Sequence, residues 1–171
     1  MTQYRIVPER SRVSIWARSS LHPIETSTDG LQGALDLEML AGGRLNLQSQ
    51  PQAKVSLPVD QLKSGNPLED RELRRRIDAR RFPTIDGELL EMHQTGVEGQ
   101  YLVRGDITFR GVTRSYAREV AVTAVDDRTL RIEGESTFDV RDFGMEPPKI
   151  LMLKVEPEVR VRVEIVAEMD V

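Results

Sequence analysis

The fold class of this chain is decided by the stretch Val159-Arg160-Val161-Arg162-Val163-Glu164-Ile165-Val166-Ala167. Apolar side chains occupy every odd position, and charged side chains occupy the even positions, with Val166 as the apolar exception. A period of two is that of a β-strand, whose successive side chains point to opposite faces. The stretch from Leu130 to Phe138 repeats the pattern in the even phase. A sheet with one apolar and one charged face must bury the apolar face.

The same period recurs along most of the chain. It predicts strands near residues 4–6, 11–20, 35–39, 45–47, 55–59, 84–91, 100–109, 116–124, 129–138 and 158–167, and a possible further one near 150–155. The polar segment 21–30 holds Pro23 and Gly30 and is interpreted as a loop. About eight strands at such short spacing favour an antiparallel barrel or a sandwich.

One segment has the period of a helix instead. Asn66 is expected to be its N-cap, Pro67 takes the first helical position, and acidic residues follow in the first turn. Leu73 and Ile77 lie four residues apart and share a face, which should pack on the barrel. The predicted helix runs from about 68 to 80, because a proline soon after it prevents continuation.

The inward positions of the strands are the candidate ligand-binding residues. They are Val13, Ile15, Ala17, Val55, Leu57, Val103, Gly105, Ile107, Val120, Val122, Ala124, Ile132, Val161 and Val163. Several inward residues are small, and an eight-stranded barrel with small inward residues can hold a small ligand. Larger neighbours can equally fill that space and make the core solid. The pattern leaves both alternatives open.

The residue types exclude several kinds of chemistry. The chain of 171 residues has no cysteine, which excludes disulfides, thiolate catalysis and cysteine-ligated zinc. His22 and His93 lie in polar, turn-like surroundings far apart in the sequence and are interpreted as exposed. No metal-ligand spacing, phosphate-binding loop or nucleophile motif is present. We therefore expect no enzymatic activity, no metal and no cofactor, in a single domain that spans residues 1–171.

The charge distribution limits the classes of partner that we expect the protein to bind. The net charge is −4, and the one concentrated group, the arginines of the predicted helix, is nearly balanced by neighbouring acids. We interpret it as a solvated helix face and not as a clamp for an anionic head group. Nucleic acid is not expected as a partner, because the protein is acidic and lacks interleaved aromatic residues. Trp16 should pack on a neighbouring element, with a role in ligand stacking or a homodimer contact as the alternative.

No segment resembles a membrane anchor. The longest apolar run is far shorter than the roughly 20 residues of a spanning helix. The first ten residues lack the apolar region of a signal peptide, so a cytoplasmic location is expected; a removed leader would make the protein periplasmic or secreted.

The chain holds three segments, residues 70–85, 105–114 and 141–145, whose order and spacing resemble those of the YceI-like family. The run from Asp70-Arg71-Glu72-Leu73 to Arg81-Phe82-Pro83-Thr84-Ile85 is similar to the family's helix and following strand. The segment Gly105-Asp106-Ile107-Thr108-Phe109-Arg110-Gly111-Val112-Thr113-Arg114 is similar to its central turn, and Arg141-Asp142-Phe143-Gly144-Met145 to a later family segment. The resemblance covers nearly the whole chain. It implies an all-β fold, a single antiparallel, lipocalin-like barrel of about eight strands, with the helix near an opening.

The resemblance also implies a function. Family members of this kind bind polyisoprenoid lipids, so the expected activity is non-catalytic binding or carriage of an apolar, isoprenoid-like or other long-chain lipid in the barrel interior. The alternative, from a different class of protein, is a solid-cored barrel that acts as an interaction or stress-related scaffold.

Overall fold

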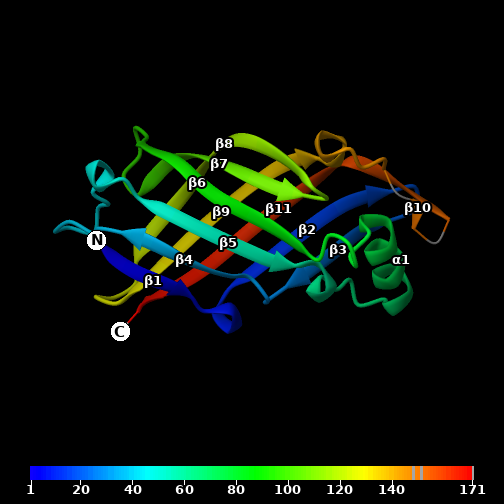
Figure 1. The fold of residues 1–171 in the computed structure, drawn as a ribbon, viewed down its shortest axis with the longest axis horizontal. Helices are drawn as coiled ribbons and strands as arrows, with labels where there is room; N and C mark the ends of the chain where they lie inside the picture. Colours follow the sequence, from blue (N-terminus) through cyan, green and yellow to red (C-terminus); the bar gives the residue numbers. More distant parts are fainter. Residues whose placement is uncertain (148, 151, 171) are drawn as a thin grey trace.

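Antiparallel strands close into a barrel in the computed structural model, which describes residues 1–147, 149–150 and 152–170 (Figure 1). Eight strands of this described part form the closed wall, because the last of them also pairs with the first. In wall order they are β1 (Thr2–Ile6), β4 (Gln32–Leu37), β5 (Gln52–Pro58), β6 (Thr84–Gln94), β7 (Gln100–Phe109), β8 (Val112–Ala124), β9 (Thr129–Asp139) and β11 (Leu153–Met169). The predicted all-β barrel is confirmed, and the sandwich alternative is wrong.

Three further strands widen the barrel at one end. The long strand β11 pairs with β1 through its C-terminal part and with β2 (Arg12–Ser19) through its N-terminal part. β3 (Pro23–Thr28) continues the sheet beyond β2, and the short β10 (Lys149–Ile150) pairs with the start of β11. The barrel wall of the described residues therefore includes extra strands at this end, which it lacks at the end where the two chain termini lie.

The helix α1 (Pro67–Ile77) lies at this widened end (Figure 1). Asn66 caps it as predicted, since its side-chain oxygen accepts a hydrogen bond from the backbone N–H of Leu68 at 3.0 Å. The helix ends three residues before the predicted boundary. Asp78 takes a left-handed conformation with φ of 59°, and its N–H bonds back to carbonyls of the last turn. Four short 3₁₀ helices complete the elements: η1 (Pro8–Arg10), η2 (Leu47–Ser49), η3 (Val59–Gln61) and η4 (Val140–Phe143).

Three expectations about single segments need correction. Residues 21–30 hold a strand, β3, whose inward positions are Ile24, Thr26 and Thr28. Only one of the three is apolar, although the two threonines are β-branched and nearly fully buried, so the apolar alternation is weak. Residues 45–47 do not form a strand; Leu45 makes an isolated bridge with Met39, and η2 follows. The expected strand near 150–155 is split between β10 and the start of β11, with residue 151 outside the described residues.

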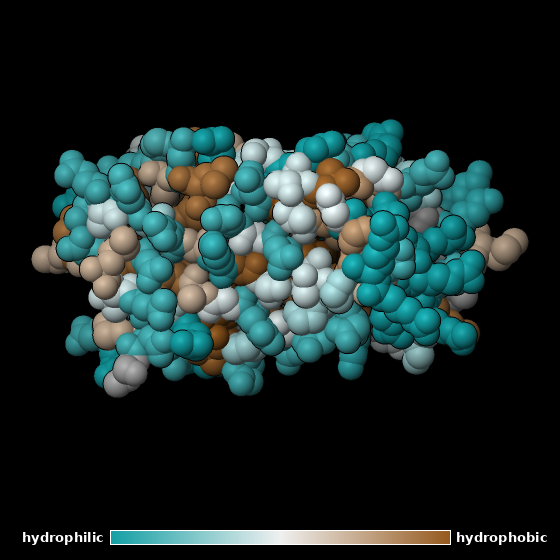
Figure 2. All heavy atoms as spheres, viewed as in Figure 1, coloured by the Kyte–Doolittle hydropathy of each residue, from teal (hydrophilic) through white to brown (hydrophobic). Residues whose placement is uncertain are grey.

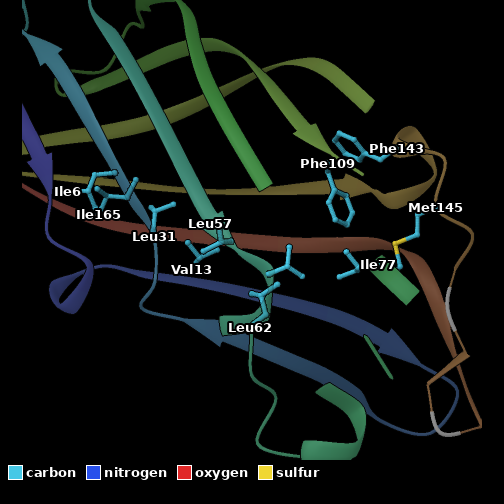
Figure 3. Close-up of a cluster of buried hydrophobic side chains, with 11 residues drawn as sticks. Ile6, Val13, Leu31, Leu57, Leu62, Ile77, Phe109, Phe143, Met145 and Ile165 are labelled. Carbon is cyan, nitrogen blue, oxygen red and sulfur yellow. The ribbon is translucent and has the colours of Figure 1, made fainter. Parts of the chain in front are cut away.

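The interior of the described residues holds three apolar clusters, the smallest of which contains Ile24, Leu153 and Val155. We call the first of the two larger clusters the solid end. It consists of Tyr4, Leu35, Leu37, Leu45, Tyr101, Val122, Leu130 and Ala167. Within this cluster, the hydroxyl oxygen of Tyr101 accepts a hydrogen bond from the Leu45 N–H at 3.1 Å. The second cluster lies toward α1 and includes Phe109, Phe143, Met145 and Ile77 (Figure 3).

The outer surface carries the charge that the alternation predicted. Figure 2 shows hydrophilic side chains over the strands and gathered over α1. Trp16 lies on this outer face beneath the Arg160 guanidinium, with 4.5 Å between the guanidinium carbon and the ring centroid. It packs on the neighbouring strand, as expected. No helix in the described part of the chain combines the length and the apolar character needed to cross a bilayer.

Candidate functional site

A cavity of about 300 Å³ lies inside the barrel at the α1 end. Residues of β2, β3, β5, β6, β7, β9 and β11 form its walls, and residues of α1 and of the segment around η4 cover it. The lining residues are Val13, Ile15, Ala17, Ile24, Thr26, Leu31, Val55, Leu57, Leu62, Leu73, Ile77, Ile85, Asp86, Gly87, Ile107, Phe109, Phe138, Asp139, Val140, Phe143, Met145, Val155, Glu156, Val159, Val161 and Val163. This barrel is thus filled at one end and hollow at the other.

The surface of the cavity is almost wholly apolar. The carboxylate of Asp86 accepts hydrogen bonds from the hydroxyls of Ser56 and Thr84, and that of Asp139 pairs with Arg141 at 2.6 Å. Asp139 has a lowered pKa because the hydrogen bonds from Arg141 stabilise its charged form. Within the described residues, no group of three or more His, Asp or Glu side chains is placed to hold a metal ion. The arrangement suits the burial of hydrocarbon and not acid–base chemistry.

Eight of the candidate residues line this cavity: Val13, Ile15, Ala17, Val55, Leu57, Ile107, Val161 and Val163. Their contact with a ligand remains a prediction. The other six, Val103, Gly105, Val120, Val122, Ala124 and Ile132, lie elsewhere in the described structure. The cavity therefore accounts for eight of the fourteen candidates, and ligand binding by the other six stays a prediction.

The six residues outside the cavity have separate physical reasons for their positions. Val122 belongs to the solid end, and Val120 and Ile132 pack against that cluster, so their apolar surface is already covered by protein. Ala124 is the last residue of β8 and is exposed beside an exposed turn. Val103 is half-buried in β7, between the two ends.

Gly105 is small for a reason other than the cavity. A Cβ at this position would lie 2.8 Å from the backbone carbonyl oxygen of Glu88 on β6, which is closer than real Cβ atoms approach. The register of β6 and β7 shifts between Leu89 and Glu91, close to this point. Gly105 therefore allows two strands to approach each other closely.

The residues that cover the cavity were missed as ligand candidates. Phe143 and Met145 flank Gly144, whose φ of 69° reverses the chain, and both side chains are buried in the cluster at this end. Phe143 packs edge-on against Phe109, with ring centroids 5.6 Å apart (Figure 3). Helical spacing did identify Leu73 and Ile77 as packing residues, and both line the cavity.

Tyr116 of β8 borders the same region. Its ring meets that of Phe138 edge-on at 4.9 Å, and its hydroxyl donates a hydrogen bond to Asp142 of η4 at 2.9 Å. Partial burial, together with this bond, raises the pKa of Tyr116 to about 12. The tyrosine thus ties β8 to the segment that covers the cavity.

The histidines lie away from the cavity. His22 is exposed in the turn between β2 and β3, with its Nδ1 3.0 Å from the carbonyl oxygen of Pro23. His93 is exposed too, but it lies within β6 and not in a turn, 3.4 Å from a carboxylate oxygen of Glu91. Arg75 and Arg76 are exposed as expected and pair with the half-buried Glu72, whereas Arg74 is itself half-buried.

Comparison with known proteins places this geometry among related barrels. A family model described as YceI-like domain matches residues 4–167. BcnA of Burkholderia cenocepacia has a similar structure, with a TM-score of 0.77 at 17% identity over 94% of this chain and 98% of that one. A polyisoprenoid binding domain from Saccharophagus degradans, implicated in plant cell wall breakdown, gives a TM-score of 0.80 at 11% identity over 99% of this chain and 100% of that one.

The YCEI protein of Campylobacter jejuni is also similar, with a TM-score of 0.63 at 11% identity over 82% of this chain and 81% of that one. No curated protein matches the chain in sequence. At these low identities the structural likenesses show a shared fold.

Proposed function

This chain belongs to the YceI-like family, as its motifs predicted, and we propose that it binds an apolar, isoprenoid-like lipid in the cavity at the α1 end without catalysing a reaction on it. The observation that carries the proposal is the cavity itself, about 300 Å³ of space with an almost wholly apolar surface. The transfer of hydrocarbon from water into such a space is favourable. Its volume and apolar lining are typical of pockets that bind small ligands. The similar domain from Saccharophagus degradans, described as polyisoprenoid binding, supports the class of ligand.

The energetics set a minimum size for the ligand. Each buried methylene contributes about 0.8 kcal/mol, and association costs at least about 4 kcal/mol. Micromolar affinity corresponds to about 8 kcal/mol, so the ligand must bury roughly fifteen methylene equivalents. Part of that hydrocarbon can be covered by Leu73 and Ile77 of α1 and by Phe143 and Met145 beside η4, which cover the cavity.

The test is direct. Native mass spectrometry of the purified protein, before and after extraction with organic solvent, should show a bound mass that extraction removes. The extracted protein should then bind a fluorescent polyene fatty acid, and an isoprenoid alcohol of fifteen to twenty carbons should displace it at roughly micromolar concentration. A protein that carries no extractable mass and binds neither compound would refute lipid binding and favour the scaffold alternative.

A further inference from the structure

The wall of the barrel is incomplete beside the cavity. β8 and β9 pair in four registered positions within the described residues, from Ala121–Glu133 to Ala124–Leu130. Their neighbours pair far longer, since β7 and β8 share ten positions and β9 and β11 share eleven. Continuing the same register would place Ala117 opposite Thr137, but the backbone ladder stops before it reaches them. We call this unpaired length, residues 115–120 of β8 against 134–139 of β9, the seam.

The Arg118 side chain occupies the seam. Its Nη1 donates to the carbonyl oxygen of Ala117 at 2.8 Å, and its Nη2 donates to the carbonyl oxygen of Thr137 at 3.3 Å. Its Nε donates to the hydroxyl of Ser136. The guanidinium thus bridges two strands at a position where the ladder would otherwise join them. No carboxylate of the described residues lies within 4.0 Å of this guanidinium, so the strand bridge is not a by-product of an ion pair.

Aromatic rings lie between the guanidinium and the cavity. The Arg118 guanidinium carbon is 5.1 Å from the ring centroids of both Tyr116 and Phe138. Phe138 and Phe143 line the cavity, and Tyr116 contacts both rings. Along the seam, therefore, side chains and not backbone hydrogen bonds separate the cavity from the outside.

Another break in the wall near the cavity is better sealed. Between β3 and β5, Ser27 and Lys63 exchange two backbone hydrogen bonds, of 3.0 and 3.1 Å. Leu31 and Leu62 are buried there. The opposite end of the barrel is filled by the solid end. Opening either of these would break backbone bonds or unpack a core. Opening the seam would require the side chains to change rotamer and the two strands to move apart, with no backbone ladder between them to break in this described stretch.

We propose that the seam is the portal through which a linear apolar chain enters the cavity, and that Arg118 is its latch. The inference rests on the proposed lipid-binding function. A linear hydrocarbon chain suits a slot between two strands, and aromatic rings line this slot. The guanidinium can release Thr137 and Ser136 at little cost, because water replaces those hydrogen bonds at the surface. Arg118 is thus a positioning residue that controls uptake and release.

Cross-linking the seam tests the proposal, and the chain's lack of cysteine makes the experiment clean. The variant Ala117→Cys with Thr137→Cys is joined by a short, reducible bis-methanethiosulfonate reagent. The control, Ala121→Cys with Glu133→Cys, joins the same two strands at a position where the ladder is already formed. Stopped-flow fluorescence then follows uptake of the polyene fatty acid by extracted protein.

The linked seam should slow uptake by at least about tenfold, because the gating motion is blocked, and reductant should restore the rate. The linked control should match the wild type, and equilibrium affinity should be unchanged in both. Unchanged uptake through the linked seam would overturn the portal and leave lipid binding standing. A wild type that binds no fatty acid would instead overturn lipid binding, and the portal with it.

A second pair of variants tests the latch. Arg118→Met should accelerate both uptake and release at nearly constant affinity, because it removes the bridge and keeps an apolar stem over the rings. Arg114→Met is the matched control, since Arg114 follows the same inward phase of β8, is exposed, and donates only to the adjacent carbonyl of Thr113 among the described contacts. Equal rates for the two variants and the wild type would refute the role of Arg118.

Discussion

Phenylalanine at three alanine positions should separate the hollow end of the barrel from the solid end. Ala17 lines the cavity, Ala167 is 0% exposed within the solid end, and Ala124 is exposed at the end of β8. The three changes add the same ring to different surroundings. They therefore isolate the effect of location from that of the side chain.

The expected magnitudes follow from what the ring displaces. At Ala17 the six added carbons occupy ligand space, which at about 0.8 kcal/mol each removes about 5 kcal/mol of binding, or more than three orders of magnitude in affinity. The free energy of unfolding should change little there, because the ring fills a void. At Ala167 the ring overpacks a filled core and should destabilise the protein by about 1–3 kcal/mol while affinity is preserved. At Ala124 neither quantity should move by more than about 0.5 kcal/mol.

The assay is a titration with the polyene fatty acid beside a urea melt for each variant. For each variant, the change in affinity is compared with the change in the free energy of unfolding. A moderate loss of stability in Ala17→Phe therefore does not obscure its loss of binding. If Ala17→Phe binds with wild-type affinity and is as unstable as Ala167→Phe, the cavity is not the ligand site and the reasoning is wrong.

Three further predictions concern the wall and the helix. Ile77→Ala should lower the free energy of unfolding by about 2–5 kcal/mol, because Ile77 is 4% exposed. Arg75→Ala should lower it by less than about 1 kcal/mol, because its ion pair with Glu72 is at the surface. Urea melts that rank the two variants the other way would show that α1 packs by another face. The pKa of Tyr116 is raised from 10.0 to about 12 in the folded protein, because the fold favours the neutral phenol. This contribution to stability is fully present below pH 10 and is lost as the pH rises toward 12. Tyr116→Phe should lack this part of the alkaline loss, and a tyrosinate absorbance titration should lose its highest step; an unchanged titration would contradict the assignment. Gly105→Ala should destabilise the fold in a thermal melt, because its Cβ would meet the Glu88 carbonyl, and unaltered stability would mean that the strands can separate there.

The alternation in the sequence was sufficient for most strands and for their orientation. Each strand has its own two-residue period, and the choice of inward face follows from where the charge lies. β3 was not predicted because two of its three inward positions are threonines, and a threonine does not reveal whether it is buried until the neighbouring strands are known. The N-cap of α1 was predictable because capping depends on a few adjacent residues.

The alternation was enough to predict antiparallel strands and their inward rows, and the motifs indicated a barrel and the family. Which parts of those rows enclose a space depends on the tertiary structure. Ala17 and Ala167 both follow inward phases of their strands, yet one lines the cavity and the other is packed in the solid end. The difference arises from the residues opposite each of them, which come from distant parts of the chain. The seam has the same origin. Arg118 stands in the inward row of β8, and its place becomes understandable only once β9 is seen to leave β8 beside it, because strand separation depends on the closure of the whole barrel and not on any local pattern.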